Sequence, residues 1–110
     1  MRYMLLIYEN EKNEQGDIQP WFDYTEAMQK AGVMKAGDAL HPTSAATTVR
    51  VKAGETVTTD GPFAETREQL GGYYLVDCKD LDEAIRWAAK MPNADRGSIE
   101  IRPVMDFDQG

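Results

Sequence analysis

Hydrophobic and polar residues form alternating blocks along the first third of this chain, and each block predicts one structural element. Residues 2–8, RYMLLIY, are a short apolar run of strand formers, whereas residues 9–17, ENEKNEQGD, are polar and predict a loop. Over residues 20–31 the apolar positions recur every three or four residues, which indicates an amphipathic helix. The proline at its start and Gly32 after its end fit this helix, and a short strand is expected over residues 33–40.

The remainder of the chain predicts a hairpin, a strand, a helix and a final strand. Residues 47–59 are Thr-rich and alternate around a turn at Ala53-Gly54, so they should form a hairpin with one covered and one solvated face. Residues 72–78 are a second run of apolar strand formers, and residues 98–104 alternate apolar with polar positions. Asp80 can cap the intervening helix by accepting a hydrogen bond from an exposed backbone N–H. The apolar stripe of that helix is expected to comprise Leu81, Ala84, Ile85 and Ala88.

The order of these elements predicts an α+β fold. Two strand–helix–strand units flank the hairpin, which suits a ferredoxin-like βαββαβ sheet with both helices on one face and an inserted β-hairpin. No linker of biased composition interrupts the sequence, and 110 residues is the size of one domain. We therefore expect residues 1–110 to form a single domain.

The two strands expected at the centre of the sheet are apolar on both of their faces. In YMLLIY and GYYLV successive side chains point to opposite sides of the sheet, yet both sets are apolar or aromatic. Two helices can cover only one face, and an exposed apolar sheet face is uncommon in a soluble monomer. A homodimer packed sheet to sheet, with a pocket between or beside the sheets, is the simplest arrangement that covers the second face.

Composition and charge remove several classes of function. Nineteen acidic against twelve basic residues give a net charge of −7, which argues against direct nucleic-acid binding and against an anionic membrane surface. The N-terminal apolar run is too short for a membrane span and lacks a signal-peptide cleavage pattern, so a reduced cytoplasm is the expected location. Cys78 is the only cysteine and ends a strand pattern, where a thiol usually acts as a small buried apolar group. No zinc pattern, phosphate-binding glycine loop or nucleophile elbow is present, and no cofactor is expected.

Residues 59–74, TDGPFAETREQLGGYY, have a structural interpretation that requires no function. Asp, Gly and Pro at 60–62 are turn formers, and Phe63 would then pack back into the core. Thr66 and Gln69 have the spacing of a capping box and would begin a single helical turn.

The same segment also has the composition of a binding loop. Its charged residues are dense and stand just before a strand expected at the centre of the sheet, and loops on rigid sheets often carry binding groups. A carboxylate at Asp60 beside an apolar pocket would have its charged form disfavoured, which makes it a candidate acid or base. Phe63, Glu65 and Arg67 are candidate ligand-binding residues; Arg67 would anchor an anionic ligand or pair with a surface glutamate.

Two residues outside this segment complete the candidate site. His41, the only histidine, follows the second expected strand, and imidazole is the side chain best suited to proton transfer near neutral pH. It would act with Asp60 only if the inserted hairpin brings the two turns together. Tyr8, at the end of the first strand, is a candidate ligand-binding phenol, with packing at the sheet edge as the alternative.

Several segments of the chain resemble a known family. TDGPFAETREQLGGYYLVDC, DLDEAIRWAAKMP and SIEIRPV, together with YMLLIY and AGDALHPTSAATTVRV, are similar to the DGPF-containing branch of the YCII-related proteins. The similarity spans nearly the whole chain, although the segment from Glu9 to Asp23 is shorter and more polar than is typical of that family.

The resemblance implies a dimeric α/β barrel of the ferredoxin-like type and several kinds of function. The wider superfamily includes muconolactone-type enzymes, and some relatives are fused to, or encoded with, extracytoplasmic-function sigma factors. A His-Asp pair has been suggested as the site in YCII-like relatives, with the histidine on the first helix. The segment WFDYTEAMQKAG has no histidine, so that assignment does not transfer, and His41 would have to supply the imidazole from another position.

Three hypotheses for function follow. The leading one is a small dimeric pocket protein that acts on a small polar molecule as a cofactor-independent lyase, isomerase or hydrolase. In that hypothesis Asp60 is the acid-base carboxylate and His41 a second proton carrier. The alternatives are a non-catalytic interaction module associated with a sigma factor and a domain that senses a ligand without turning it over.

Overall fold

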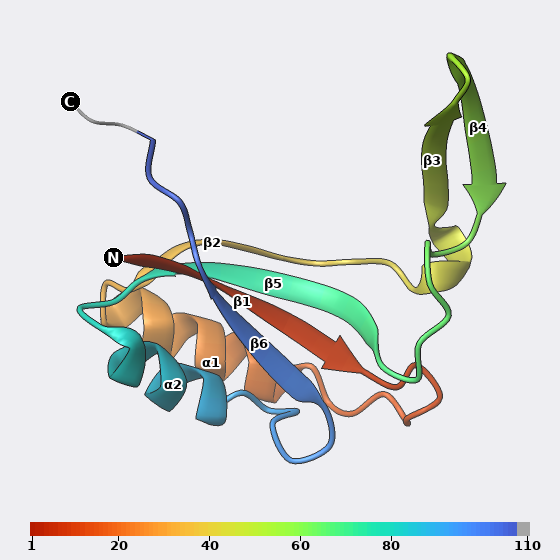
Figure 1. Cartoon of the computed structure of the whole chain (residues 1–110). Coiled ribbons are helices and arrows are strands. Elements are labelled where there is room, and N and C mark those ends of the chain that lie inside the picture. The colour runs from red at the N-terminus through yellow and green to blue at the C-terminus, as the bar shows by residue number, and fades with distance from the viewer. Residues whose placement is uncertain (108–110) are drawn as a thin grey trace.

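An antiparallel sheet with two helices packed on one face forms the body of the molecule (Figure 1). The structure is a computed structural model that describes residues 1–107. The elements are, in chain order, β1 (Arg2–Glu9), α1 (Gln19–Lys30), β2 (Met34–Ala39), the short 3₁₀ helix η1 (Thr43–Ala45), β3 (Thr47–Lys52), β4 (Glu55–Asp60), β5 (Gln69–Asp77), α2 (Leu81–Ala89) and β6 (Ser98–Pro103). The main sheet has the order β2-β5-β1-β6, so the two strands predicted to be central are central. This arrangement is consistent with the predicted ferredoxin-like α+β fold.

Alternate residues of the central strands build the core beneath the helices. Tyr3, Leu5 and Ile7 of β1 are buried, while the residues between them are partly exposed, because successive strand side chains point to opposite faces. Leu5 lies opposite Tyr74 of β5 and Ile101 of β6, so three neighbouring strands contribute to the same layer. The buried core cluster comprises Tyr3, Leu5, Ile7, Tyr24, Met28, Val33, Tyr74, Val76, Cys78, Ala84 and Met91.

Helix α1 forms where the three-and-four spacing predicted it. Pro20 lies in its first turn, and the side chain of Asp17 accepts a hydrogen bond from the Gln19 N–H at 3.0 Å just before it. Tyr24 and Met28, one turn apart, are its two buried residues. The helix therefore buries a narrow stripe and leaves its first turns free to border a cavity.

Helix α2 is capped as predicted, but only half of its expected stripe is buried. The side chain of Asp80 accepts a hydrogen bond from the Glu83 N–H at 2.9 Å. Ala84 and Ala88 face the sheet, whereas Leu81 and Ile85 are about half exposed. The small alanine side chains let the helix lie close to the sheet. Leu81 and Ile85 then lie beside the helix–sheet contact, where solvent reaches them. No helix within residues 1–107 combines the length and apolar character needed to span a membrane.

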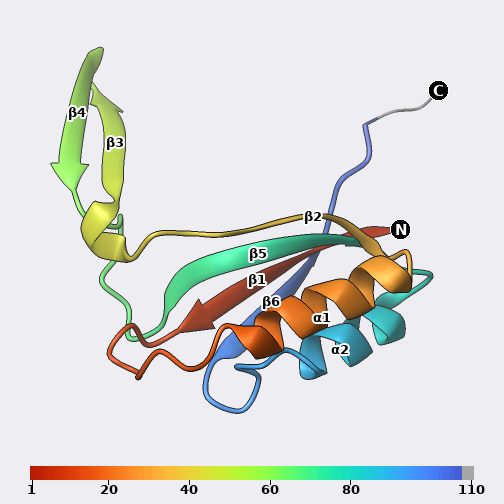
Figure 2. The same cartoon turned by 180° about the vertical axis from the view of Figure 1, so that it is seen from behind.

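No helix covers the face of the sheet opposite α1 and α2 (Figure 2). The strand alternation places Met4 and Leu6 of β1 on this face, paired with Leu75 and Tyr73 of β5. All four side chains are partly exposed. The sequence prediction that two helices would cover only one of two apolar faces is therefore confirmed.

The β3–β4 hairpin stands away from the main sheet, on the side opposite the helices (Figures 1 and 2). Its register pairs Val49 with Thr58 and Val51 with Thr56. Val51 is 68% exposed, and every residue of β4 is exposed. The face of the hairpin that was expected to be covered is thus not covered within this chain.

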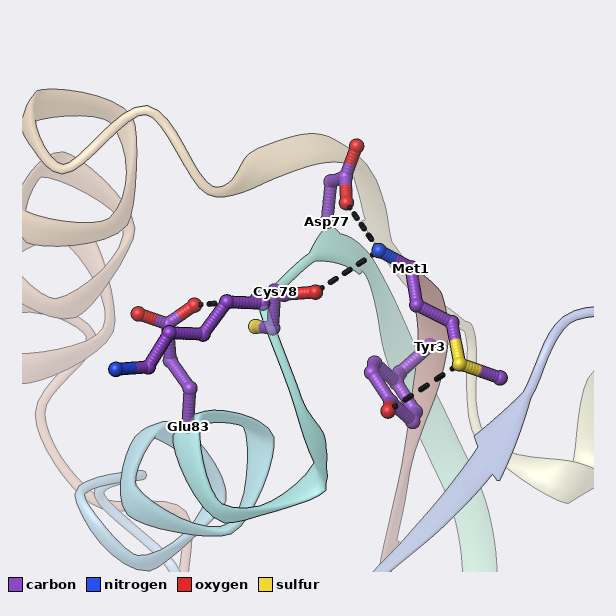
Figure 3. A network of polar contacts seen from close by, with 6 residues as sticks. Met1, Tyr3, Asp77, Cys78 and Glu83 are labelled. Atoms are coloured by element: carbon purple, nitrogen blue, oxygen red, sulfur yellow. Dashed lines mark hydrogen bonds and ion pairs between the residues drawn. The ribbon is translucent and has the colours of Figure 1, made fainter.

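The amino group of Met1 ties the first strand to the end of β5 (Figure 3). It donates to the carboxylate of Asp77 at 3.0 Å and to the carbonyl oxygen of Cys78 at 2.9 Å. The hydrogen bond first, and the positive charge second, hold the pKa of Asp77 below its ordinary value. Cys78 itself is 2% exposed, and burial raises the pKa of its thiol to about 11. It is a buried apolar group, as predicted, and not a reactive thiol.

Candidate functional site

A cavity of about 550 Å³ lies beside the first turns of α1. The loop between β1 and α1, the end of β2, the start of β5 and the loop after α2 form its other walls. These segments are far apart in sequence, and the sheet brings them together at one end of the molecule. Cavities of this size commonly hold small organic molecules.

Aromatic and aliphatic side chains form much of the cavity wall. Trp21 and Phe22 come from α1, and Tyr74 comes from β5. The hydroxyl of Tyr74 is within 2.7 Å of the hydroxyl of Thr25, so a polar pair breaks this wall at one point. Phe22 and Ile18 are both more than half exposed, so they add apolar surface to the cavity lining that solvent can reach.

Asn93 is the most unusual polar residue of this wall. It is 1% exposed, and neither side-chain amide atom has a hydrogen-bond partner anywhere in residues 1–107. Its backbone oxygen accepts hydrogen bonds from the N–H groups of Arg96 and Gly97 at 3.1 and 2.9 Å, which fixes the turn that leads into β6. A buried amide without partners costs about 1–3 kcal/mol. Both amide atoms are inaccessible, so they face packed protein and not the open space of the cavity.

Arg96 and Glu9 form an ion pair in the same wall. The Nε atom of Arg96 lies 3.5 Å from Oε2 of Glu9 at the end of β1. Its Nη1 atom donates to the carbonyl oxygen of Pro92 at 3.2 Å and lies 3.6 Å from Asp95. The guanidinium is therefore already engaged by two carboxylates and one carbonyl.

The edge strand β2 brings a second carboxylate to the cavity. The hydroxyl of Tyr73 on β5 donates to Oδ2 of Asp38 at 2.8 Å, and this hydrogen bond raises the pKa of Tyr73. A Cβ atom added at Gly37 would meet the ring of Tyr74 on the helix side, so the strand alternation places the Asp38 side chain on the opposite side. Asp38 is nevertheless a lining residue, so it borders the cavity at the edge of the sheet.

Glu11 links the loop after β1 to η1. Its carboxylate accepts hydrogen bonds from both the backbone N–H and the hydroxyl of Thr43, the former at 2.8 Å. These two bonds, the hydroxyl first, lower the pKa of Glu11. The contact joins segments that are 32 residues apart in sequence and borders the cavity on one side.

The residues expected from the sequence lie in different places. His41 lines the cavity, directly after β2. Asp60 ends β4 and is exposed, and it is not among the described residues that line the cavity. Tyr8 lies on the uncovered sheet face, where its hydroxyl donates to Glu100 at 3.1 Å and partial burial raises its pKa. The structure of the single chain therefore does not bring Asp60 or Tyr8 to the cavity that contains His41.

The segment around the DGPF turn connects the hairpin to β5. Gly61 has a φ of 102°, which favours glycine, and its N–H donates to the Ala46 carbonyl oxygen at 2.7 Å. Phe63 is 80% exposed and does not pack into the core, contrary to the structural interpretation of the sequence. Glu65 and Arg67 are exposed as well.

No helical turn forms at the expected capping box. The hydroxyl of Thr66 donates to the Glu68 carbonyl oxygen at 2.6 Å, and the Gln69 amide donates to the carbonyl oxygens of Ala64 and Thr66. Gln69 already belongs to β5, which begins three residues earlier than predicted because Gln69 and Leu70 pair with the end of β1.

The polar residues of the cavity that the sequence analysis missed carry little local signal. Asp38 stands three residues before His41 in AGDALHP, and this proximity is the one hint that the sequence offers. Asn93 and Arg96 follow a helix stop at Pro92 and resemble ordinary loop residues. Within residues 1–107 no group of three or more His, Cys, Asp or Glu side chains is placed to hold a metal ion.

The fold and this cavity define a small α+β protein with a ferredoxin-like sheet and a site beside its first helix. The chain belongs to the YCII-related domain family, which matches residues 1–108. It is also 41% identical to "Uncharacterized protein R00369" of Rhizobium meliloti (strain 1021), in an alignment that covers 100% of this chain and 97% of that protein. The family resemblance expected from the sequence is confirmed, and the narrower DGPF branch stays a prediction.

Proposed function

We propose that this protein binds a small organic molecule in the cavity beside α1 and acts on it by proton transfer, as a cofactor-independent enzyme. The observation that carries the proposal is the cavity of about 550 Å³ itself, which segments far apart in sequence build beside α1 and which His41 lines. The aromatic wall formed by Trp21, Phe22 and Tyr74 supports the same proposal, because it would bury the apolar part of such a ligand.

Two cavity residues can carry a proton. His41 follows β2, and Asp38 lies on β2 and accepts a hydrogen bond from Tyr73. An imidazole and a carboxylate that border the same space can serve as the two partners of a proton abstraction and return. The proposal gives His41 the role predicted from the sequence and adds Asp38 as its acidic partner.

Asp60 can act as the acid-base carboxylate only if it reaches the cavity of another chain in an oligomer. The hairpin carries it on the side of the sheet opposite the helices, so a second chain would have to receive it (Figure 1). Phe63, Glu65 and Arg67 lie in the exposed segment between β4 and β5, outside the cavity lining, so the same condition applies to them.

A second copy of this chain is the partner we propose for the uncovered sheet face. Its centre is apolar, and the hairpin stands on the same side with exposed valines. An isolated two-stranded hairpin is marginally stable in water, so contact with another chain would stabilise it. Packing two such faces together would also enclose the side of the cavity at Asp38.

Binding is tested by a thermal-shift screen of small polar metabolites on wild type and two variants. Ala39→Trp places a large side chain at a lining position and should abolish the stabilisation that ligands provide, whereas Ala27→Trp, at an exposed α1 position outside the lining, should not. Ligands that stabilise wild type and Ala39→Trp equally would contradict the proposal.

Proton transfer is tested on the ligands that this screen identifies. Wild type in D₂O should exchange carbon-bound hydrogen of the ligand or form product, as followed by NMR. His41→Gln and Asp38→Asn should slow this reaction by about 10²-fold or more while ligand binding persists. Asp60→Asn is the matched test of the alternative carboxylate. If a ligand binds tightly but shows neither hydrogen exchange nor product, the protein is a ligand sensor and not an enzyme.

The second candidate function is an interaction module for an extracytoplasmic-function sigma factor. The exposed valines of the hairpin favour it, since such residues commonly pack in an interface. Titration with a purified sigma factor of this class should then show binding that Val51→Asp abolishes and Ala39→Trp leaves intact. The opposite result, with cavity ligands and no sigma-factor binding, would favour the enzyme.

A further inference from the structure

The ionisable groups that line the cavity are strongly unbalanced in charge. Five carboxylates line it against a single guanidinium and one imidazole. The carboxylates are Glu9, Glu11, Glu14, Asp17 and Asp38. Carboxylates gathered around a partly enclosed space raise the local concentration of cations there.

Most of this negative charge is not neutralised by the protein. Of the five, only Glu9 pairs with a cationic side chain, that of Arg96. Glu11 and Asp38 accept hydrogen bonds from neutral groups, which orient a carboxylate without cancelling its charge. Glu14 has no hydrogen bond or ion pair in the described part of the chain, and Lys12 of the same loop is not among the lining residues.

The uncharged part of the cavity fits the same kind of ligand. Trp21, Phe22 and Tyr74 offer ring surfaces, and aromatic faces attract organic cations. Arg96 is the one permanent cation of the lining, and its Nε and Nη1 atoms lie 3.5 and 3.6 Å from the carboxylates of Glu9 and Asp95, which weakens its attraction for an anionic ligand.

We infer that the ligand of this cavity is a small organic cation, an amine with an apolar or aromatic body. This inference rests on the proposed function and makes its substrate class definite. Glu14 and Asp17 supply unneutralised charge from the loop after β1, and the rings bury the body of the ligand. Neutral and anionic molecules of the same shape bind more weakly.

The test compares three probes of one shape: 2-phenylethylamine, 2-phenylethanol and phenylacetate. Binding is followed by NMR, through the side-chain amide signals of Asn93 and the indole N–H signal of Trp21. The amine should bind about tenfold more tightly than the alcohol, and phenylacetate most weakly. Adding salt should weaken binding of the amine and leave that of the alcohol unchanged.

Paired variants separate local charge from net charge. Glu14→Gln combined with Asp17→Asn should reduce the preference for the amine severalfold. Glu55→Gln combined with Asp82→Asn changes the net charge equally at exposed positions outside the cavity, and it should leave the preference intact. Loss of preference in both variants would show that only the overall charge of the protein matters, and would overturn the inference.

The outcomes distinguish this inference from the proposed function. If the three probes bind equally, or if phenylacetate binds most tightly, the ligand is not a cation and the inference is wrong. The proposal that the cavity binds a small molecule would still be supported. If none of the probes shifts the signals of Asn93 or Trp21 at millimolar concentration, both the inference and the proposed cavity site fail.

Discussion

The hydroxyl of Tyr24 in α1 donates a 2.7 Å hydrogen bond to the backbone carbonyl oxygen of Trp87 in α2. The two rings also meet edge to face, with their centroids 6.0 Å apart and an interplanar angle of 79°. Burial raises the pKa of Tyr24, so the hydroxyl keeps its proton and stays a donor. This one residue therefore joins the two helices above the sheet.

Tyr24→Phe should lower the free energy of unfolding by about 1 kcal/mol, because it removes this hydrogen bond and keeps the ring. The loss is moderate, since the Trp87 carbonyl still accepts from the Lys90 N–H at 3.1 Å. Thermal unfolding should shift down by roughly 4–8 °C. Tyr73→Phe, which removes an exposed hydroxyl contact, serves as the control and should change stability less. Equal stability of wild type and Tyr24→Phe would show that the bond contributes nothing.

Gly97→Ala should destabilise the protein by about 1–3 kcal/mol, because there is no space for a side chain at this position. An added Cβ atom would clash with the carbonyl oxygen of Tyr8 and would lie 2.9 Å from Nδ2 of Asn93. The matched control is Gly71→Ala, whose nearest contact would be an ordinary 4.0 Å to the Ile7 carbonyl oxygen. Urea denaturation of the two variants should separate them clearly. A Gly97→Ala protein no less stable than Gly71→Ala would show that the turn before β6 can shift.

Most of the fold was predictable because its signals are local. Asp80 was assigned as a cap, and Pro20 as part of a helix start, from residue type and neighbours alone. The burial of Leu81 and Ile85 was predicted wrongly, because the angle at which α2 meets the sheet depends on the alanines beneath it. The extent of β5 was missed for a similar reason, since Gln69 joins it through pairing with a distant strand.

The candidate site was less predictable, because it depends on contacts between distant segments. His41 was chosen for its chemistry and does line the cavity. Asn93 could not be chosen, since an asparagine after a helix stop is ordinary until the fold buries it. The dense polar residues around Asp60 and Phe63 were read as a site, but residue type in a turn does not say which way the turn points.

Asp77→Asn should make the stability of the protein less sensitive to acid. The Met1 amino group holds the pKa of Asp77 below its unfolded value, so the ion pair stabilises the folded state above that unfolded value and is lost as the pH falls through the folded-state pKa. Wild type should be the more stable protein at pH 7, and the difference should shrink as the pH falls below about 4 and through the lowered pKa of Asp77. Glu65→Gln, an exposed substitution elsewhere, should show no such trend. A difference in stability that persists at the lowest pH would assign it to something other than this pair.

Glu11→Ala should loosen the loop after β1 without unfolding the protein. The substitution removes both hydrogen bonds to Thr43, which hold this loop against η1. Amide hydrogen exchange should quicken in residues 10–18 and at Thr43, with little change in the sheet. Glu14→Ala, in the same loop and without a contact in the described residues, is the control and should leave exchange at Thr43 unchanged. Identical exchange in the two variants would show that Glu11 does not hold the loop.

Leu6→Glu should prevent the proposed pairing of two chains through the uncovered sheet face. Leu6 lies at the centre of that face, opposite Tyr73, and a carboxylate there would be buried against a second apolar sheet. Wild type should sediment as a dimer and Leu6→Glu as a folded monomer, with circular dichroism confirming that the secondary structure is retained. Ile85→Glu makes the same chemical change on the exposed side of α2 and should leave the dimer intact. If wild type is monomeric at micromolar concentration, the proposed dimer is contradicted. Asp60 could then not contribute to the cavity of a second chain.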